Sequence, residues 1–288
     1  MKKIGSILLA AVLIGTMLTG CGQQTGDSPS ASPSSASGAT SSRLSIIGST
    51  SVHPLMEDLV NAYKTKADVT VDLQGVGSSA GIKQASEGTA DIGMSSRELK
   101  EEEKTWGLNE YVIANDGIAV IVNPANGVTN LTKDQVAQIF KGEITNWKEV
   151  GGEDKNIVVI SRESGSGTRG AFEEILGLEG ESDGKTVSLT RADALINDSN
   201  GAVKAGVASR DAAIGYLSLG AVDSSVKALN VDDVVASEDN VKNGSYPIAR
   251  PFIIMTKGTP SETEQGLIDF ILSDEGQNIV AENYVSVN

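Results

Sequence analysis

The stretch IVVISRESGSGTRGAFEEIL, residues 157–176, decides the fold. It opens with an apolar run, Ile157–Ile160, that is typical of a buried strand, and it closes with the helix-like segment Thr168–Leu176. A loop of Arg, Ser, Gly and Thr lies between the two. A strand, a Gly/Ser loop and a helix in this order indicate an α/β protein.

The same unit occurs twice more, nearer the N-terminus. A strand over Leu44–Ile47 is followed by the loop GSTSVHP, residues 48–54, and a helix over Pro54–Lys64. A strand over Val69–Leu73 is followed by GVGSSAG, residues 75–81, and a short helix. The remaining pattern predicts strands over Ile118–Val122 and Ile253–Met255, and helices over Thr132–Phe140, Ser261–Leu272 and Glu275–Ala281.

The N-terminus has the features of a bacterial lipoprotein precursor. Two lysines precede a short apolar run, Ile4–Leu18, and Leu18-Thr-Gly-Cys21 resembles a lipobox. The run is too short for a membrane span, which needs about 20 residues. We predict a signal peptide over 1–20, a lipid on Cys21, and a disordered Ser/Gly-rich tether within 21–43. Cys21 is the only cysteine, so no intrachain disulfide can form.

The composition argues against several classes of partner. The formal net charge is −15 and there is no basic run, which excludes a nucleic-acid-binding surface. One His and one Cys cannot supply a zinc-type ligand set, so we predict neither a metal nor another cofactor. An acidic chain repels anions at long range, so any anion must be bound by a local site.

The three Gly/Ser loops are candidates for such a site. The start of a helix offers backbone N–H groups without partners and a partial positive charge, and both favour an anion. Glycine lets the backbone come close to a ligand, and hydroxyls add neutral donors. One such loop is ordinary capping chemistry. Three of them, one carrying Arg162, predict that they converge on a single oxyanion.

Two loops also match enzyme patterns. GSGTRG, residues 165–170, fits the dinucleotide pattern G-x-G-x-x-G, but it lies in mid-chain, whereas a dinucleotide site usually begins the fold. GSSAG, residues 77–81, fits the nucleophile elbow around Ser79, yet the only possible base, His53, precedes it and suits a helix start better. The acidic runs Glu101–Glu103 and Asp232–Asp233 are interpreted as solvated surface. We therefore predict that the protein is not an enzyme.

Taken together, the motifs resemble a known family. GSTS (48–51), GVGSSAG (75–81), ADIGMSSR (90–97), SRESGSGT (161–168), IFKGEITNW (139–147) and AIGY (213–216) are similar, in this order, to the phosphate-binding lipoproteins of Pst ABC transporters. The resemblance implies a two-lobed type 2 periplasmic-binding-protein fold with the ligand in the cleft. Two strands would cross a hinge, near 118–123 and 248–253. Lobe 1 would comprise 44–121 and 250–288, and lobe 2 would comprise 122–249.

The resemblance also implies the function and its residues. The protein would capture inorganic phosphate and deliver it to ABC transporter permease subunits. It would act as a monomer on the outer face of the cell membrane, held there by its lipid anchor only. The implied ligand-binding residues are Thr50, Ser51, Ser78, Ser96, Arg162, Ser166, Gly167 and Thr168.

One implied residue departs from the family pattern. Many members have an aspartate where this chain has Ser96, and that carboxylate accepts the proton of hydrogen phosphate and repels proton-free anions. An acid that some members have in the third loop is likewise replaced here, by Ser164. Candidate replacements are Asp91, Asp116, Glu163 and Asp198, and the sequence does not choose among them. A receptor for another tetrahedral oxyanion, such as sulfate or molybdate, stays open as the alternative.

Overall fold

The computed structural model describes residues 42–288, and these residues form one compact unit. The predicted signal peptide, the lipidation at Cys21 and nearly all of the predicted tether lie outside the described residues. The first strand begins at Ser42 rather than at Leu44. The last two residues of the predicted tether, 42 and 43, therefore belong to this strand. Within the described part, no helix is long and apolar enough to cross a membrane.

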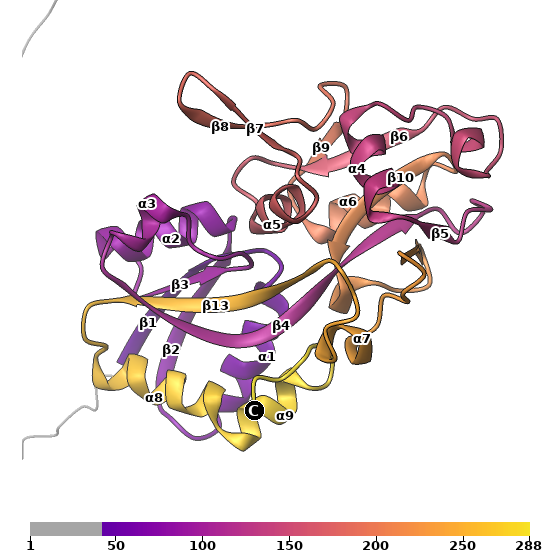
Figure 1. Ribbon diagram of the computed structural model, residues 1–288. Coiled ribbons are helices and arrows are strands. Elements are labelled where there is room, and N and C mark those ends of the chain that lie inside the picture. Colours follow the sequence, from indigo (N-terminus) through magenta and orange to yellow (C-terminus); the bar gives the residue numbers. More distant parts are fainter. Residues whose placement is uncertain (1–41) are drawn as a thin grey trace, which may run out of the picture. The chain divides into compact units, whose positions relative to one another are not determined.

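A mixed sheet runs through both lobes in the order β2-β1-β3-β13-β4-β10-β6-β9 (Figure 1). In the first lobe β1 (Ser42–Gly48) pairs in parallel with β2 (Val69–Gly75) and β3 (Ile92–Ser95), and β13 (Ala249–Lys257) pairs antiparallel with β3. In the second lobe β6 (Val158–Arg162) pairs in parallel with β10 (Ala213–Ser218) and β9 (Leu195–Asn197).

The long strand β4 (Leu108–Val122) belongs to both lobes. Its first part, up to Gly117, pairs with β13, and its last part, from Ile118, pairs with β10. Gly117 and Ala249 are partners in the register, so the two strands lie side by side where one lobe gives way to the other. The expected two-strand connection is therefore present. The predicted lobe limits at 121/122 and 249/250 stay predictions.

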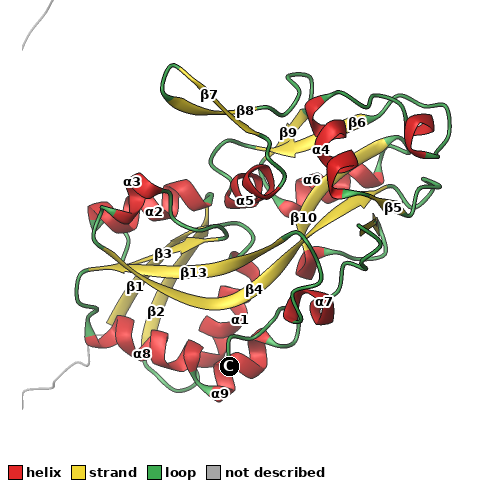
Figure 2. Cartoon of the chain, viewed as in Figure 1, coloured by secondary structure: helices red, strands yellow, loops and turns green. Residues whose placement is uncertain are grey.

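Helices cover the sheet in both lobes (Figure 2). The first lobe carries α1 (His53–Tyr63), α2 (Ser78–Glu87), α8 (Glu262–Leu272) and α9 (Asp274–Val280). The second carries α4 (Lys133–Lys141), α5 (Gly167–Ile175) and α6 (Asn200–Ala208). The smaller elements are α3 (Glu101–Lys104), β5 (Asn130–Leu131), η1 (Trp147–Val150), β7 (Glu179–Ser182), β8 (Lys185–Ser188), η2 (Leu219–Ala221), β11 (Lys227–Ala228), β12 (Asn230–Val231) and α7 (Glu238–Lys242).

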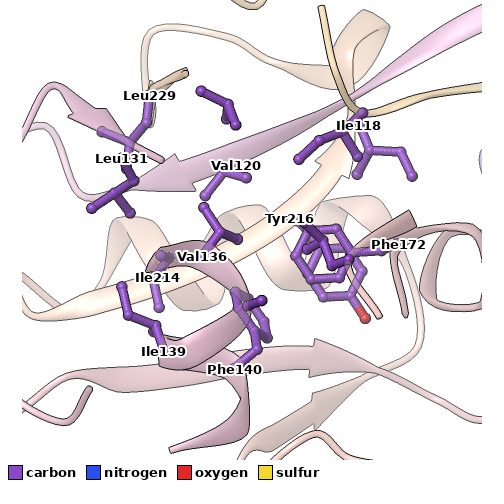
Figure 3. Packing of buried hydrophobic residues seen from close by; sticks show 14 of the residues in the cluster. Ile118, Val120, Leu131, Val136, Ile139, Phe140, Phe172, Ile214, Tyr216 and Leu229 are labelled. Atoms are coloured by element: carbon purple, nitrogen blue, oxygen red, sulfur yellow. The ribbon is translucent and has the colours of Figure 1, made fainter. Parts of the chain in front are cut away.

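Each lobe has its own apolar core. Leu55, Leu59, Phe252 and Leu267 belong to the first. Figure 3 shows the second, in which Phe172 of α5 stacks on Tyr216 of β10 with ring centroids 3.9 Å apart. Because helices pack on both lobes through such side chains, the starts of α1, α2 and α5 are held fixed relative to the sheet.

Candidate functional site

The three Gly/Ser loops lie where β1, β2 and β6 end and α1, α2 and α5 begin. Parallel strands end at the same edge of a sheet, so the loops after β1 and β2 are neighbours. Gly48 shows how closely the first of these loops packs against β3, because a Cβ at this position would lie 2.1 Å from the carbonyl oxygen of Met94. Its φ of +152° is also one that favours glycine. The prediction that all three loops open helices is confirmed.

Loops of the first lobe contact the loop of the second directly. The Ser51 Oγ lies 2.8 Å from the Thr168 Oγ1, and the Arg162 Nη2 donates to the Thr50 Oγ1 at 2.9 Å. The backbone N–H of Ser79 donates to the carbonyl of Gly165 at 3.2 Å. The structure therefore brings residues from both lobes together in one place.

Gly167 packs closely against the first lobe. A Cβ there would lie 2.1 Å from the Ser78 Oγ and 2.7 Å from the Ser96 Oγ. Gly167 and Thr168 are the first residues of α5, and N–H groups in a first helical turn have no carbonyl partner within the helix. Ser166 is the N-cap, and its side chain accepts from the Arg169 N–H. The eight residues predicted as a site are thus adjacent to one another.

Arg162 is the central cation of this cluster, with a side chain that is 1% exposed. Its Nε and Nη2 donate to the two carboxylate oxygens of Glu163 at 3.0 and 3.1 Å. Its Nη2 also lies 3.2 Å from the Asp198 carbonyl. The guanidinium is therefore held in a fixed orientation that points to Thr50 of the other lobe.

Asn200 belongs to the cluster although no sequence motif indicated it. Its Oδ1 accepts from the Arg162 Nη1 at 3.3 Å, and its Nδ2 donates to the Ser51 Oγ at 3.2 Å, so it connects the lobes. Its only sequence signal is the position after Ser199, the N-cap of α6. That position resembles many ordinary helix starts, so the residue could not be distinguished.

The structure separates the four acids considered as replacements at Ser96. Asp91 is exposed and accepts from the N–H and Oγ of Ser45. Asp116 is buried against Arg250 at 2.9 Å and also accepts from Ser218. Asp198 offers its backbone carbonyl to Arg162. Only Glu163 directs its carboxylate at the cationic residue of the cluster.

Next to Ser96, a buried ion pair supports the first lobe's side of the cluster. Arg97 donates through both terminal nitrogens to Glu103, at 2.7 and 2.8 Å, and also donates to the Ser79 Oγ. Glu103 is 5% exposed, so the interpretation of Glu101–Glu103 as solvated surface is wrong for this residue. Burial by itself would raise the pKa of the Glu103 carboxyl, but hydrogen bonds from Arg97 and the Lys100 N–H outweigh it and lower that pKa.

Substituting Glu103 by glutamine is expected to lower the free energy of unfolding at neutral pH by about 3 kcal/mol, because it leaves Arg97 buried without a counter-charge. A carboxyl whose pKa is lowered by folding stabilises the protein above its unfolded value near 4.5, and that stabilisation is lost as the pH falls through the folded pKa. In denaturant titrations the difference between the two proteins should therefore be constant above about pH 5 and shrink progressively as the pH falls below about 4.5. A difference that does not shrink anywhere on the acid side of pH 4.5 would contradict this explanation.

The geometry does not support the enzyme patterns. The Ser79 Oγ accepts from Arg97, and in the part of the chain that is described no hydrogen bond joins it to His53. His53 instead begins α1, as expected. The GSGTRG loop faces hydroxyls of the other lobe. Among residues 42–288, no group of His, Cys, Asp and Glu could hold a metal ion.

Known proteins are similar to this chain over most of its length. The model of the PBP superfamily domain matches residues 33–275. The phosphate-binding protein PstS of Bacillus subtilis is 32% identical over 295 residues, which cover 100% of this chain and 95% of the relative. The chain belongs to the PstS family.

Solved structures show the same PstS-family fold. A proposed phosphate ABC transporter substrate-binding protein from Clostridium perfringens, with bound phosphate, is 48% identical with a TM-score of 0.81. An ABC-type phosphate transport receptor from Vibrio cholerae is 40% identical with a TM-score of 0.73. Both alignments cover 85% of this chain and 100% of the other. The expected two-lobed type 2 periplasmic-binding-protein fold is thereby confirmed.

Proposed function

We propose that this PstS-family chain captures inorganic phosphate outside the cytoplasm and delivers it to the permease of an ABC transporter. The observation that carries the proposal is the cluster of donors contributed by both lobes. Thr50, Ser51, Ser78 and Ser96 come from the first lobe, and Arg162, Ser166, Gly167 and Thr168 from the second. The names of the relatives, which describe phosphate binding and phosphate transport, support it.

Capture requires a ligand held between two lobes that can separate. An oxyanion among these residues would receive hydroxyl and N–H donors from both sides together with the charge of Arg162. Charge-assisted hydrogen bonds contribute about 1.5–3 kcal/mol each, so several of them reach sub-micromolar affinity despite the cost of association. We propose that bending of β4 and β13 near Gly117 and Ala249 opens and closes the cleft.

The remaining parts of the proposal concern where the protein works. We propose that Cys21 carries the lipid, that the segment after it tethers the lobes to the outer face of the membrane, and that the protein acts as a non-enzymatic monomer without nucleic acid. Mass spectrometry of protein extracted from a bacterial membrane should find a mature N-terminus at Cys21 with acyl chains attached. An unmodified N-terminus elsewhere would refute the anchor.

Thermal unfolding with and without phosphate tests the binding. The protein from Gly22 onward, freed of bound anions by unfolding and dialysis, should be stabilised by about 4 kcal/mol at a phosphate concentration 1,000 times the Kd. Chloride at equal ionic strength is the control. A transition temperature that is the same in both salts would contradict phosphate binding.

A further inference from the structure

Asp116 and Arg250 form a buried ion pair at the point where the two connecting strands leave the first lobe. They are partners in the register of β4 and β13, next to the pair Gly117 and Ala249. The Arg250 Nε and Nη2 donate to the Asp116 Oδ2 at 3.2 and 2.9 Å, and both side chains are 1% exposed. Removing two charges from water is costly, so stability alone does not explain a buried pair at this place.

Arg250 connects the pair to the proposed phosphate site. Its Nη1 donates to the carbonyl oxygen of Ser96 at 3.1 Å, and the N–H of Ser96 donates to the Ser78 Oγ at 3.1 Å. The backbone of Ser96 is therefore held on both sides, which fixes the position of its hydroxyl opposite Gly167. The guanidinium belongs firmly to the first lobe, because its carbon lies 5.4 Å from the ring centre of Phe252.

Asp116 connects the pair to the second lobe. Its Oδ1 accepts from the hydroxyl of Ser218, the last residue of β10, at 3.0 Å. Burial raises the pKa of the Asp116 carboxyl, and Arg250 opposes that rise. Ser218 and the N–H of Gly220, which lies in η2 just after β10, oppose it as well. One oxygen of the carboxylate thus serves the first lobe, and the other serves the second.

This arrangement is sensitive to the angle between the lobes. The two oxygens of a carboxylate are rigidly joined, so they cannot follow two bodies that move apart. When β4 bends at Gly117, Asp116 must either lose Ser218 or turn away from Arg250. With Ser218 in place, Asp116 is held where Arg250 reaches both it and the Ser96 carbonyl, and the members of such a hydrogen-bond chain stabilise one another.

We propose that the Asp116–Arg250 pair couples the binding of phosphate at Ser96 to closure of the lobes, with Ser218 as its contact in the second lobe. The inference rests on the proposed phosphate site. Asp116, Arg250 and Ser218 act through Ser96, so they are positioning residues and not ligands. Closure completes the bond from Ser218, and by thermodynamic linkage phosphate bound at Ser96 favours closure to the same extent.

Ser218→Ala tests the coupling, because it removes the link to the second lobe and leaves the ion pair intact. We expect phosphate to be released about fivefold faster, with an association rate within about twofold of that of the unmodified protein, since only the closed state is weakened. Release is measured by chasing bound labelled phosphate with excess unlabelled phosphate, and the calorimetric Kd then gives the association rate. A lower folding stability alone would not change the release rate.

Tyr246→Phe is the matched control. The buried Tyr246 hydroxyl donates to the carbonyl of Ile118 at 3.0 Å, and both residues lie on the second lobe's side of Gly117. We expect this variant to be less stable but to release phosphate at the unmodified rate. Equal acceleration in both variants, or unchanged release from Ser218→Ala, would overturn the inference and leave the phosphate function intact. Absence of phosphate binding by the unmodified protein would refute both.

A double-mutant cycle tests whether the effect of Ser218 passes through the ion pair. Asp116→Ala combined with Arg250→Met removes both charges, so neither is left buried alone. In this background phosphate should be released at least about fivefold faster, and adding Ser218→Ala should change the rate by less than about twofold. A further fivefold effect would show that the link bypasses the pair, and would overturn the proposal. Circular dichroism verifies folding; if the double variant does not fold, Ser218→Ala and Tyr246→Phe decide the proposal.

Discussion

Replacing Arg162 by methionine is expected to weaken phosphate binding by about 1,000-fold. Arg162 is the one cation among the eight proposed site residues, and its side chain is 1% exposed, so methionine removes a charge-assisted donor that water cannot replace. The substitution also leaves the Glu163 carboxylate beside the anion without the guanidinium that it now contacts at 3.0 Å. The lost donor and the uncompensated carboxylate both lower the affinity for phosphate.

A second substitution separates these two effects. Adding Glu163→Gln to Arg162→Met should raise the affinity about tenfold above that of the single Arg162→Met variant. The uncompensated negative charge is removed, but the donor of Arg162 is still absent, so the affinity does not return to that of the unmodified protein. Arg210→Met, at an exposed arginine that donates to the Gly206 carbonyl, is the matched control and should bind phosphate normally. Calorimetry gives the affinities, and circular dichroism verifies folding. Unimpaired binding by Arg162→Met would refute the site assignment.

Replacing Gly167 by alanine should abolish measurable phosphate binding while the protein remains folded. The new methyl group would lie 2.1 Å from the Ser78 Oγ and 2.8 Å from the Ser78 Cβ, distances that no side-chain rotation of alanine can relieve. Because these contacts lie between the lobes, we expect the cleft to stay open instead of the cores unfolding. An open cleft loses the donors of one lobe.

Gly165→Ala provides the control from the same loop. A Cβ at Gly165 has no heavy atom within 4 Å, and its φ is not positive, so alanine should be tolerated there. We expect phosphate affinity within about threefold of the unmodified protein, and a small-angle scattering profile that still contracts with phosphate. Gly167→Ala should show no contraction. Equal behaviour of the two variants would contradict the close approach at Gly167.

Much of this molecule could be predicted because its signals are local. The apolar runs and the Gly/Ser loops predicted β1, β2, β6 and the helices that follow them, and the family motifs predicted the eight clustered residues. β4 was predicted only over Ile118–Val122, because its first part alternates with polar residues and lies at a partly exposed face of the sheet. The hydrophobic periodicity and the strand propensity of the sequence are both weak over this part of β4.

Other features depended on contacts between distant parts of the chain. Asn200 is part of the cluster through Arg162 and Ser51, and Ser51 lies 149 positions away in the sequence. The burial of Glu103 depends on Arg97, although three consecutive glutamates suggest a solvated surface. No local pattern carries such information.

A crystal structure of the protein with phosphate is the sharpest test of the proposed site. We expect one tetrahedral anion that contacts the Arg162 guanidinium, the hydroxyls of Ser78 and Ser96, and the first N–H groups of α5, with both lobes engaged. An anion bound at another place, or at one lobe alone with Arg162 still turned to Glu163 and Thr50, would contradict it.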